Sequence, residues 1–181
     1  MKLRTIITAA ILSLSTTLSA QNLTEYYSVK NSAESKQYIL TPQEIFEDEK
    51  GRKLSHSVTI EKFAEQIIDD EVLPKNDMVT ITLSFTLPTS KKIRTINIKS
   101  RRFSFTSHKA EPISTILQKK MWVHKYRVTT TKEKVKELYS VNHPPIITII
   151  LEGGEVFQYT KIHKAWMKYA PIGNQIFELT N

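Results

Sequence analysis

The 181-residue sequence contains no cysteine. This absence excludes a disulfide framework, a thiolate zinc site and a cysteine nucleophile. Lipidation of an N-terminal cysteine is excluded for the same reason. Glycine is scarce, with four residues, and the Walker A, dinucleotide-binding and nucleophile-elbow patterns are all missing. The sequence therefore predicts no glycine-rich phosphate-binding loop.

Long hydrophobic runs are missing too, and the apolar stretch near the start has the layout of a secretory signal peptide. Lys2 and Arg4 form a basic start, and Ala20 supplies a small residue at the expected cleavage point. The apolar stretch between them is shorter than the roughly 20 residues of a membrane-spanning helix. We therefore expect residues 1–20 to be removed and the remainder to be exported without a membrane span. An uncleaved anchor is the alternative.

An exported domain without disulfides is more typical of a bacterial envelope protein, in the periplasm or the medium, than of a small eukaryotic secreted domain. Residues 21–181 are enough for one domain with its own core. We expect an α+β fold, with a mostly antiparallel sheet of about five to seven strands and two or three helices on one face. Residues 21–37 are polar and predict a loose arm or an edge strand.

Helix signals occur at several places. Capping boxes begin at Thr41 and at Thr130. Apolar residues between 59 and 70 fall at helical spacing, which predicts an amphipathic helix with an acidic outer side. A short helix is expected after Pro112, and residues 161–170 fit either a strand or a helix.

Other segments alternate with a period of two, the pattern of a strand with one buried face. Val79–Leu87 and Trp122–Val128 follow it throughout. Ile96 and Ile98 have the opposite parity to Phe103 and Phe105, so we expect a bulge or bend near residues 100–102 that returns both pairs to the core side. A short final strand is expected at the C-terminal end, over residues 175–179.

The segment 146–159 predicts a hairpin. Gly153 and Gly154 supply the positive φ angles of a tight turn between two apolar runs. The first run, 146–151, is almost entirely apolar, which predicts a central strand covered on both faces.

Charge is distributed unevenly along the chain. Residues 21–77 contain 12 acidic and 7 basic residues, whereas residues 78–181 contain 6 acidic and 17 basic residues. Such asymmetry indicates either two complementary faces or an anionic partner, and a merely solvated surface is the third interpretation.

Strand parity places four cations on outer surfaces: Lys99, Arg101, Lys125 and Arg127. If their two strands lie side by side, one face gathers all four and suits phosphate, sulfate or uronate groups. Alternatively, the acidic helix expected over residues 61–71 covers this face within the same molecule. Nucleic acid is not expected as a partner, because no aromatic recognition strand is present.

No cofactor or metal site is predicted. The histidines are far apart, and none has metal-ligand spacing. His124 is expected to be buried and hydrogen-bonded rather than a catalytic base. The cluster Asp69-Asp70-Glu71 lacks the spaced oxygen ligands of a calcium loop and is interpreted as a solvated helix end.

These observations favour a non-catalytic exported binding or adaptor protein, with a cationic sheet face for an anionic glycan or an acidic protein. A small secreted hydrolase with a dispersed active site and a structural subunit of an envelope assembly are the alternatives. An enzyme should show a pocket with a close acid–base pair, a binding module an open cationic face, and a subunit an apolar patch or a free sheet edge. The sequence names no catalytic residue, and it leaves the oligomeric state open.

Overall fold

A computed structural model describes residues 26–33, 35–63, 66–68, 71–73 and 77–180, with the side chains of 63–76 left out of the description. Within these residues, ten strands form one antiparallel sheet, two more form a separate hairpin, and two helices are present. The strands are β1 (Tyr27–Asn31), β2 (Ser35–Glu47), β3 (Lys53–Phe63), β4 (Gln66–Ile68), β5 (Glu71–Leu73), β6 (Met78–Leu87), β7 (Ile93–Lys99), β8 (Ser104–Ser107), β9 (Glu111–Gln118), β10 (Met121–Thr131), β11 (Ile146–Leu151) and β12 (Val156–Lys161), and the helices are α2 (Lys132–Val135) and α3 (His163–Leu179).

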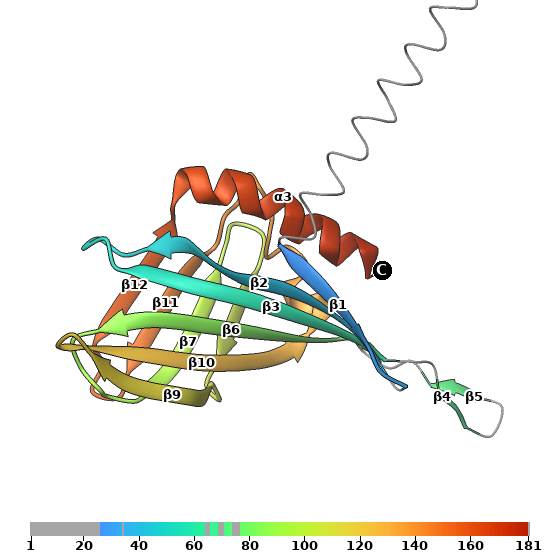
Figure 1. Cartoon of the computed structure of the whole chain (residues 1–181), viewed down its shortest axis with the longest axis horizontal. Helices are drawn as coiled ribbons and strands as arrows, with labels where there is room; N and C mark the ends of the chain where they lie inside the picture. The colour runs from blue at the N-terminus through green and yellow to red at the C-terminus, as the bar shows by residue number, and fades with distance from the viewer. Residues whose placement is uncertain (1–25, 34, 64–65, 69–70, 74–76, 181) are drawn as a thin grey trace, which may run out of the picture.

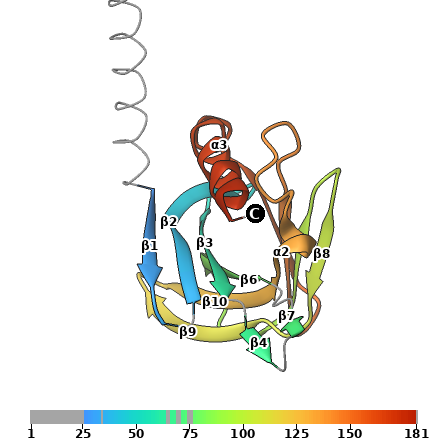
Figure 2. The ribbon, with the colours of Figure 1, turned by 90° about the vertical axis from the view of Figure 1, so that its right-hand side faces the viewer.

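The large sheet has the order β8-β7-β11-β12-β2-β3-β6-β10-β9, with β1 paired to β2. It is strongly curved, and α3 lies across its open side (Figure 1, Figure 2). The hairpin β4–β5 lies at one end, away from α3 (Figure 1). The α+β class and the mostly antiparallel sheet are therefore confirmed, whereas the predicted count of five to seven strands is too low.

The core lies inside the curve of the sheet, because alternate residues of each strand point there. In β6, Val79, Ile81, Leu83, Phe85 and Leu87 are buried while the residues between them are only partly covered. From the helical side, α3 contributes Trp166, Tyr169 and Ile176, all buried. Burial of this apolar surface is the main stabilising contribution to the fold.

The amphipathic helix predicted for residues 59–70 is wrong. Residues up to 63 belong to β3, and 66–68 form β4. The buried residues Leu54, His56, Val58 and Ile60 alternate with half-buried polar ones, so a period of two begins upstream of the segment that suggested a helix. Asp69 and Asp70 lie outside the described residues, as does the predicted signal peptide.

Two further helix predictions, at Thr41 and after Pro112, are also wrong. Thr41 lies in β2, where its hydroxyl donates to the Tyr26 carbonyl at 3.1 Å rather than to a helix N-terminus. The neighbouring Pro42 falls within a register shift of β2 against β3, a place where a missing N–H is tolerated. The helix predicted after Pro112 is strand β9.

The predictions for the two ends of the chain have different outcomes. Residues 27–31 form an edge strand on β2, one of the two alternatives for the polar N-terminal segment. The ambiguous residues 161–170 belong mainly to α3, which begins at His163. The same helix continues through residues 175–179, so the predicted final strand is wrong. A short helix, α2, does follow Thr130, but it begins at Lys132 with Thr131 as N-cap and without a side-chain capping bond, so the predicted capping box does not form.

Two predictions concern the strands near the site. The expected bulge or bend near residues 100–102 is a bend: the chain reverses after Lys99 and pairs β7 with β8, so that Ile98 lies opposite Phe105 and both phenylalanines pack against the core. The 146–159 hairpin is confirmed, with Gly153 and Gly154 at φ of 108° and 88°. Its loop has three residues, since the Leu151 amide donates to the Glu155 carbonyl at 2.9 Å. β11 is a central strand, but only one of its faces is buried, so the prediction that both faces are covered is wrong. Among the described residues, no helix is long and apolar enough to cross a bilayer.

Candidate functional site

The candidate site lies on the outer face of β7, β11 and β12, and the strand register explains its composition. The inward positions of these strands are taken by buried residues such as Ile98, Ile147 and Tyr159. Directly opposite residues then form an outward row across the three strands, made of Asn97, Thr148 and Gln158. Cross-strand neighbours of this kind are about 5 Å apart, close enough to contact one ligand together.

A pocket of about 350 Å³ lies over this row. Lys99 and Ile146, which face each other across β7 and β11, extend it in one direction. The full lining is Asn97, Lys99, Ser100, Arg101, Pro144, Ile146, Thr148 and Gln158. We call these eight residues the cationic pocket. It combines two cations, hydroxyl and amide groups and an apolar part, and no carboxylate lines it.

The turn after β7 positions Arg101. The Ser100 amide donates to the Phe103 carbonyl at 2.8 Å, and the Ser100 hydroxyl oxygen accepts from the amides of Arg102 and Phe103 at 3.1 and 3.3 Å. On the strand itself, the Asn97 amide oxygen accepts from the Thr106 hydroxyl at 2.7 Å. With that oxygen occupied, the group that Asn97 offers to a ligand is its NH₂ donor.

The four predicted cations do not form one face. Lys99 and Arg101 lie together at the cationic pocket, and Lys125 and Arg127 lie on β10. In the sheet, β11, β12, β2, β3 and β6 separate β7 from β10. The expectation that the two strands are neighbours is therefore wrong, because strand parity determines the face of the sheet but not the order of its strands.

The two pairs also differ in their surroundings. The Arg127 Nε lies 2.7 Å from a Glu111 carboxylate oxygen, whereas neither Lys99 nor Arg101 has an ion-pair partner among the described residues. Lys125 lies over a smaller hollow of about 240 Å³ lined otherwise by Pro42, Ser55, Ser57, Thr82 and Ser84. The predicted cover by an acidic helix is absent in the described part of residues 61–71. Glu61, the first acid of that segment, accepts hydrogen bonds from the Ser35 hydroxyl and the Gln37 side-chain amide at the N-terminal end of β2.

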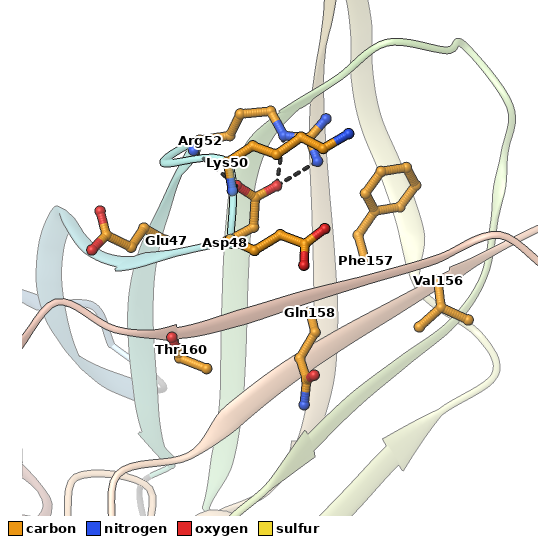
Figure 3. A pocket seen from close by; sticks show the side chains of 9 residues that line it. Glu47, Asp48, Lys50, Arg52, Val156, Phe157, Gln158 and Thr160 are labelled. Carbon is orange, nitrogen blue, oxygen red and sulfur yellow. Dashed lines mark hydrogen bonds and ion pairs between the residues drawn. The ribbon is translucent and has the colours of Figure 1, made fainter.

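A larger pocket, of about 560 Å³, shares Gln158 with the cationic pocket. Figure 3 shows the side chains that line it. The pocket forms because β12 pairs with β2 only at Thr160 and Lys161, after which the β2–β3 turn diverges from β12. The sequence did not predict this pocket. The pocket depends on how β12 pairs with β2, and no local sequence pattern encodes that pairing. Its lining is Glu47, Asp48, Glu49, Lys50, Arg52, Val156, Phe157, Gln158 and Thr160.

Several polar groups of this larger pocket already hold the turn together. The Asp48 carboxylate accepts from the Arg52 Nε at 2.6 Å and from the amides of Lys50 and Arg52 at 2.9 Å each. Burial opposes ionisation of Asp48, but these hydrogen bonds outweigh it and lower the pKa of the carboxyl. The Arg52 guanidinium carbon also lies 5.2 Å from the centre of the Phe157 ring. Figure 3 draws both side chains at this pocket. The ion pair between Asp48 and Arg52 therefore stabilises the turn between β2 and β3.

The buried histidines belong to the core. The His124 Nε2 lies 2.8 Å from the Thr89 carbonyl, so it carries the proton and donates, and the ring stacks on Phe85. The prediction of a buried, hydrogen-bonded histidine is confirmed. His56 bonds to the Tyr139 hydroxyl at 2.8 Å, and burial lowers its pKa to about 3. Neither ring lines the pockets described above.

Within the described ranges, no group of three or more histidine or carboxylate side chains is placed to hold a metal ion. No model of a known protein family matches the chain, and searches of curated proteins and of solved structures also give no match. The functional argument therefore depends on the geometry of the cationic pocket.

Proposed function

We propose that the protein is a non-catalytic binding protein and that its cationic pocket holds an acidic group of a glycan. The observation that carries this proposal is the placement of Lys99 and Arg101, which have no ion-pair partner among the described residues, beside a pocket whose described lining contains no carboxylate. Arginine can grip a carboxylate or sulfate through two parallel hydrogen bonds, and lysine adds a point charge.

The remaining lining favours a sugar over a simple ion. Thr148, Gln158 and Asn97 present hydroxyl and amide groups, which match the donors and acceptors of sugar hydroxyls. Ile146, with 38% of its surface exposed, supplies an apolar contact beside Pro144. A volume of about 350 Å³ lies at the small end of ligand pockets, consistent with one acidic residue of a longer chain.

The hydrolase alternative receives no support from the histidines, since each buried ring is enclosed by aromatic side chains and occupied by a hydrogen bond. Export and removal of residues 1–20 remain part of the proposal, and they rest on the sequence pattern. Intact mass of the protein recovered from a secreting host tests them. A species that still carries Met1–Ala20 would show an anchored protein instead.

The binding proposal is tested by two variants with the same change in net charge. Lys99→Glu/Arg101→Glu reverses the cations of the pocket, and Lys125→Glu/Arg127→Glu reverses the pair on β10. Binding to a heparin-derived oligosaccharide and to oligogalacturonate is measured by titration calorimetry. We expect the first variant to lose binding by at least about tenfold, and the second to retain it within about threefold.

Native binding should weaken with added salt, since exposed charges are screened over about 8–10 Å at physiological ionic strength. Equal losses in both variants would replace the pocket with diffuse attraction by net charge. If the native protein binds neither oligosaccharide at low salt, the proposal of an acidic glycan is wrong.

A further inference from the structure

The strand β12 has an unpaired edge along part of its length. It pairs with β11 through residues 156–159, but with β2 only through Thr160 and Lys161. Beyond that point β2 passes into the β2–β3 turn, and none of the described strands takes its place beside Val156 and Gln158. Both residues line the larger pocket of about 560 Å³ (Figure 3). The larger pocket therefore occupies the position of a missing strand beside β12.

Two hydrogen bonds show which backbone groups of β12 face the larger pocket. At the hairpin, the Leu151 amide donates to the Glu155 carbonyl, so this pair is hydrogen-bonded. Hydrogen-bonded and non-hydrogen-bonded pairs alternate along an antiparallel ladder, and the register of β11 and β12 has no shift. Val156 and Gln158 therefore direct their N–H and C=O groups away from β11, towards the larger pocket. The amide of Ile162, which has the same phase, donates to a β2 carbonyl at 2.8 Å and agrees with this assignment.

The charge of the larger pocket differs from that of the cationic pocket. Its lining contains three carboxylates and two cations, whereas the described lining of the cationic pocket has two cations and no carboxylate. Ion pairs neutralise Glu47 and Asp48. The remaining Glu49 and Lys50 offset each other, so the larger pocket gives a second acidic group no net attraction to balance its loss of hydration. Uncharged hydroxyl groups can instead accept from the backbone N–H groups and donate to the carbonyl and carboxylate oxygens.

We propose that the larger pocket is a second subsite, which holds an uncharged sugar next to the acidic sugar in the cationic pocket. This inference rests on the proposed function. Gln158 makes the two subsites continuous, because it lines both pockets and its backbone groups face the larger one. Val156, with 58% of its surface exposed, adds apolar surface for the C–H face of a sugar ring. The ligand class that the two pockets select together is a glycan in which acidic sugars alternate with uncharged ones.

Hexasaccharides of two kinds test this preference. In hyaluronan and in unsulfated chondroitin, glucuronate alternates with an uncharged N-acetylated sugar, whereas every sugar of oligogalacturonate is acidic. Titration calorimetry at one low ionic strength should give at least about threefold tighter binding of the two alternating hexasaccharides, although they carry half as many carboxylates. Attraction by net charge alone would give the reverse order, because the more highly charged chain would bind more tightly.

A charge reversal separates the second subsite from the cationic pocket. Glu49→Lys leaves Lys50 unopposed and adds a second cation, so it should reduce the preference for the alternating hexasaccharides at least about threefold by tightening the binding of oligogalacturonate. Glu178→Lys makes the same change in net charge at the exposed C-terminal end of α3 and should retain the native preference. Thermal midpoints close to the native value would show that both variants are folded, as expected for exposed positions.

The second subsite and the acidic-glycan proposal fail in different ways. Equal binding of all three hexasaccharides by the native protein, or an unchanged preference in Glu49→Lys, would overturn the second subsite and leave the acidic-glycan proposal standing. If the native protein binds none of the three at low salt, the acidic-glycan proposal is wrong, and the second subsite is wrong with it.

Discussion

The interior beneath α3 and the outer face of β7, β11 and β12 are built from the same alternating strands, but their polar groups have opposite roles. Inside, the His56 ring and the Tyr169 hydroxyl are bonded to the Tyr139 hydroxyl and the Thr41 carbonyl. Outside, Lys99 and Arg101 lack ion-pair partners within the described chain. The comparison teaches that interior polar groups serve the fold, whereas the outer ones are available to a ligand.

Truncating the central side chain of the interior should have the largest effect. Trp166 is fully buried, packs against Phe46 and Tyr139, and donates to the Val141 carbonyl at 3.3 Å. Trp166→Ala should lower the free energy of unfolding by about 3–5 kcal/mol, because it leaves a cavity and an unpaired acceptor. Urea denaturation measures this. Met167→Ala, at an exposed position on the same helix, is the control and should change little.

Adding one carbon beside the same cluster should destabilise the fold by less. A Cβ atom at Gly173 would lie 2.5 to 2.7 Å from three ring carbons of Tyr139, whose ring is itself buried. Gly173→Ala should therefore lower the free energy of unfolding by about 1–3 kcal/mol, despite the better helix propensity of alanine. Gln175→Ala, exposed two residues further on, should leave the urea midpoint unchanged. A stabilised Gly173→Ala protein would show that α3 packs less closely than described.

Acid should loosen the interior through His56. Its folded pKa of about 3 is below the ordinary 6.5, so as pH falls the unfolded chain binds a proton first. The stability that depends on neutral His56 is complete above about pH 6.5 and is lost as pH falls towards 3, by at most about 1.4 kcal/mol per pH unit. The difference between the unfolding free energies at pH 7 and at pH 5.5 should be smaller in His56→Gln than in the native protein. His163→Gln, at an exposed position, should retain the native slope.

The outer face should show the smallest effect on stability. Lys99→Ala and Arg101→Ala remove exposed side chains that form no ion pair with the described part of the chain, so each should change the free energy of unfolding by less than about 0.5 kcal/mol. Their loss should nevertheless weaken binding to an acidic oligosaccharide. A destabilisation comparable to that of the interior variants would contradict the separation of roles between the two regions.

Several strands were missed for a definable physical reason. The β9–β10 turn uses Lys119 and Lys120 at positive φ, where glycine or asparagine is the usual signal, so β9 resembled a helix after Pro112. In β3, the apolar residues at its end coincided with helical spacing. Strand pairing supplies hydrogen bonds and burial that outweigh such weak local preferences.

The sequence alone determined which side chains of β6, β7 and β10 face inward, because the strand period of two is a property of the backbone. It also determined that Gly153 and Gly154 form a turn and that Lys99 and Arg101 point outward. Only the tertiary structure decided which strands are neighbours, and hence that Lys125 and Arg127 lie apart from the cationic pocket. Strand order depends on contacts between residues distant in the chain, and no local pattern encodes those contacts.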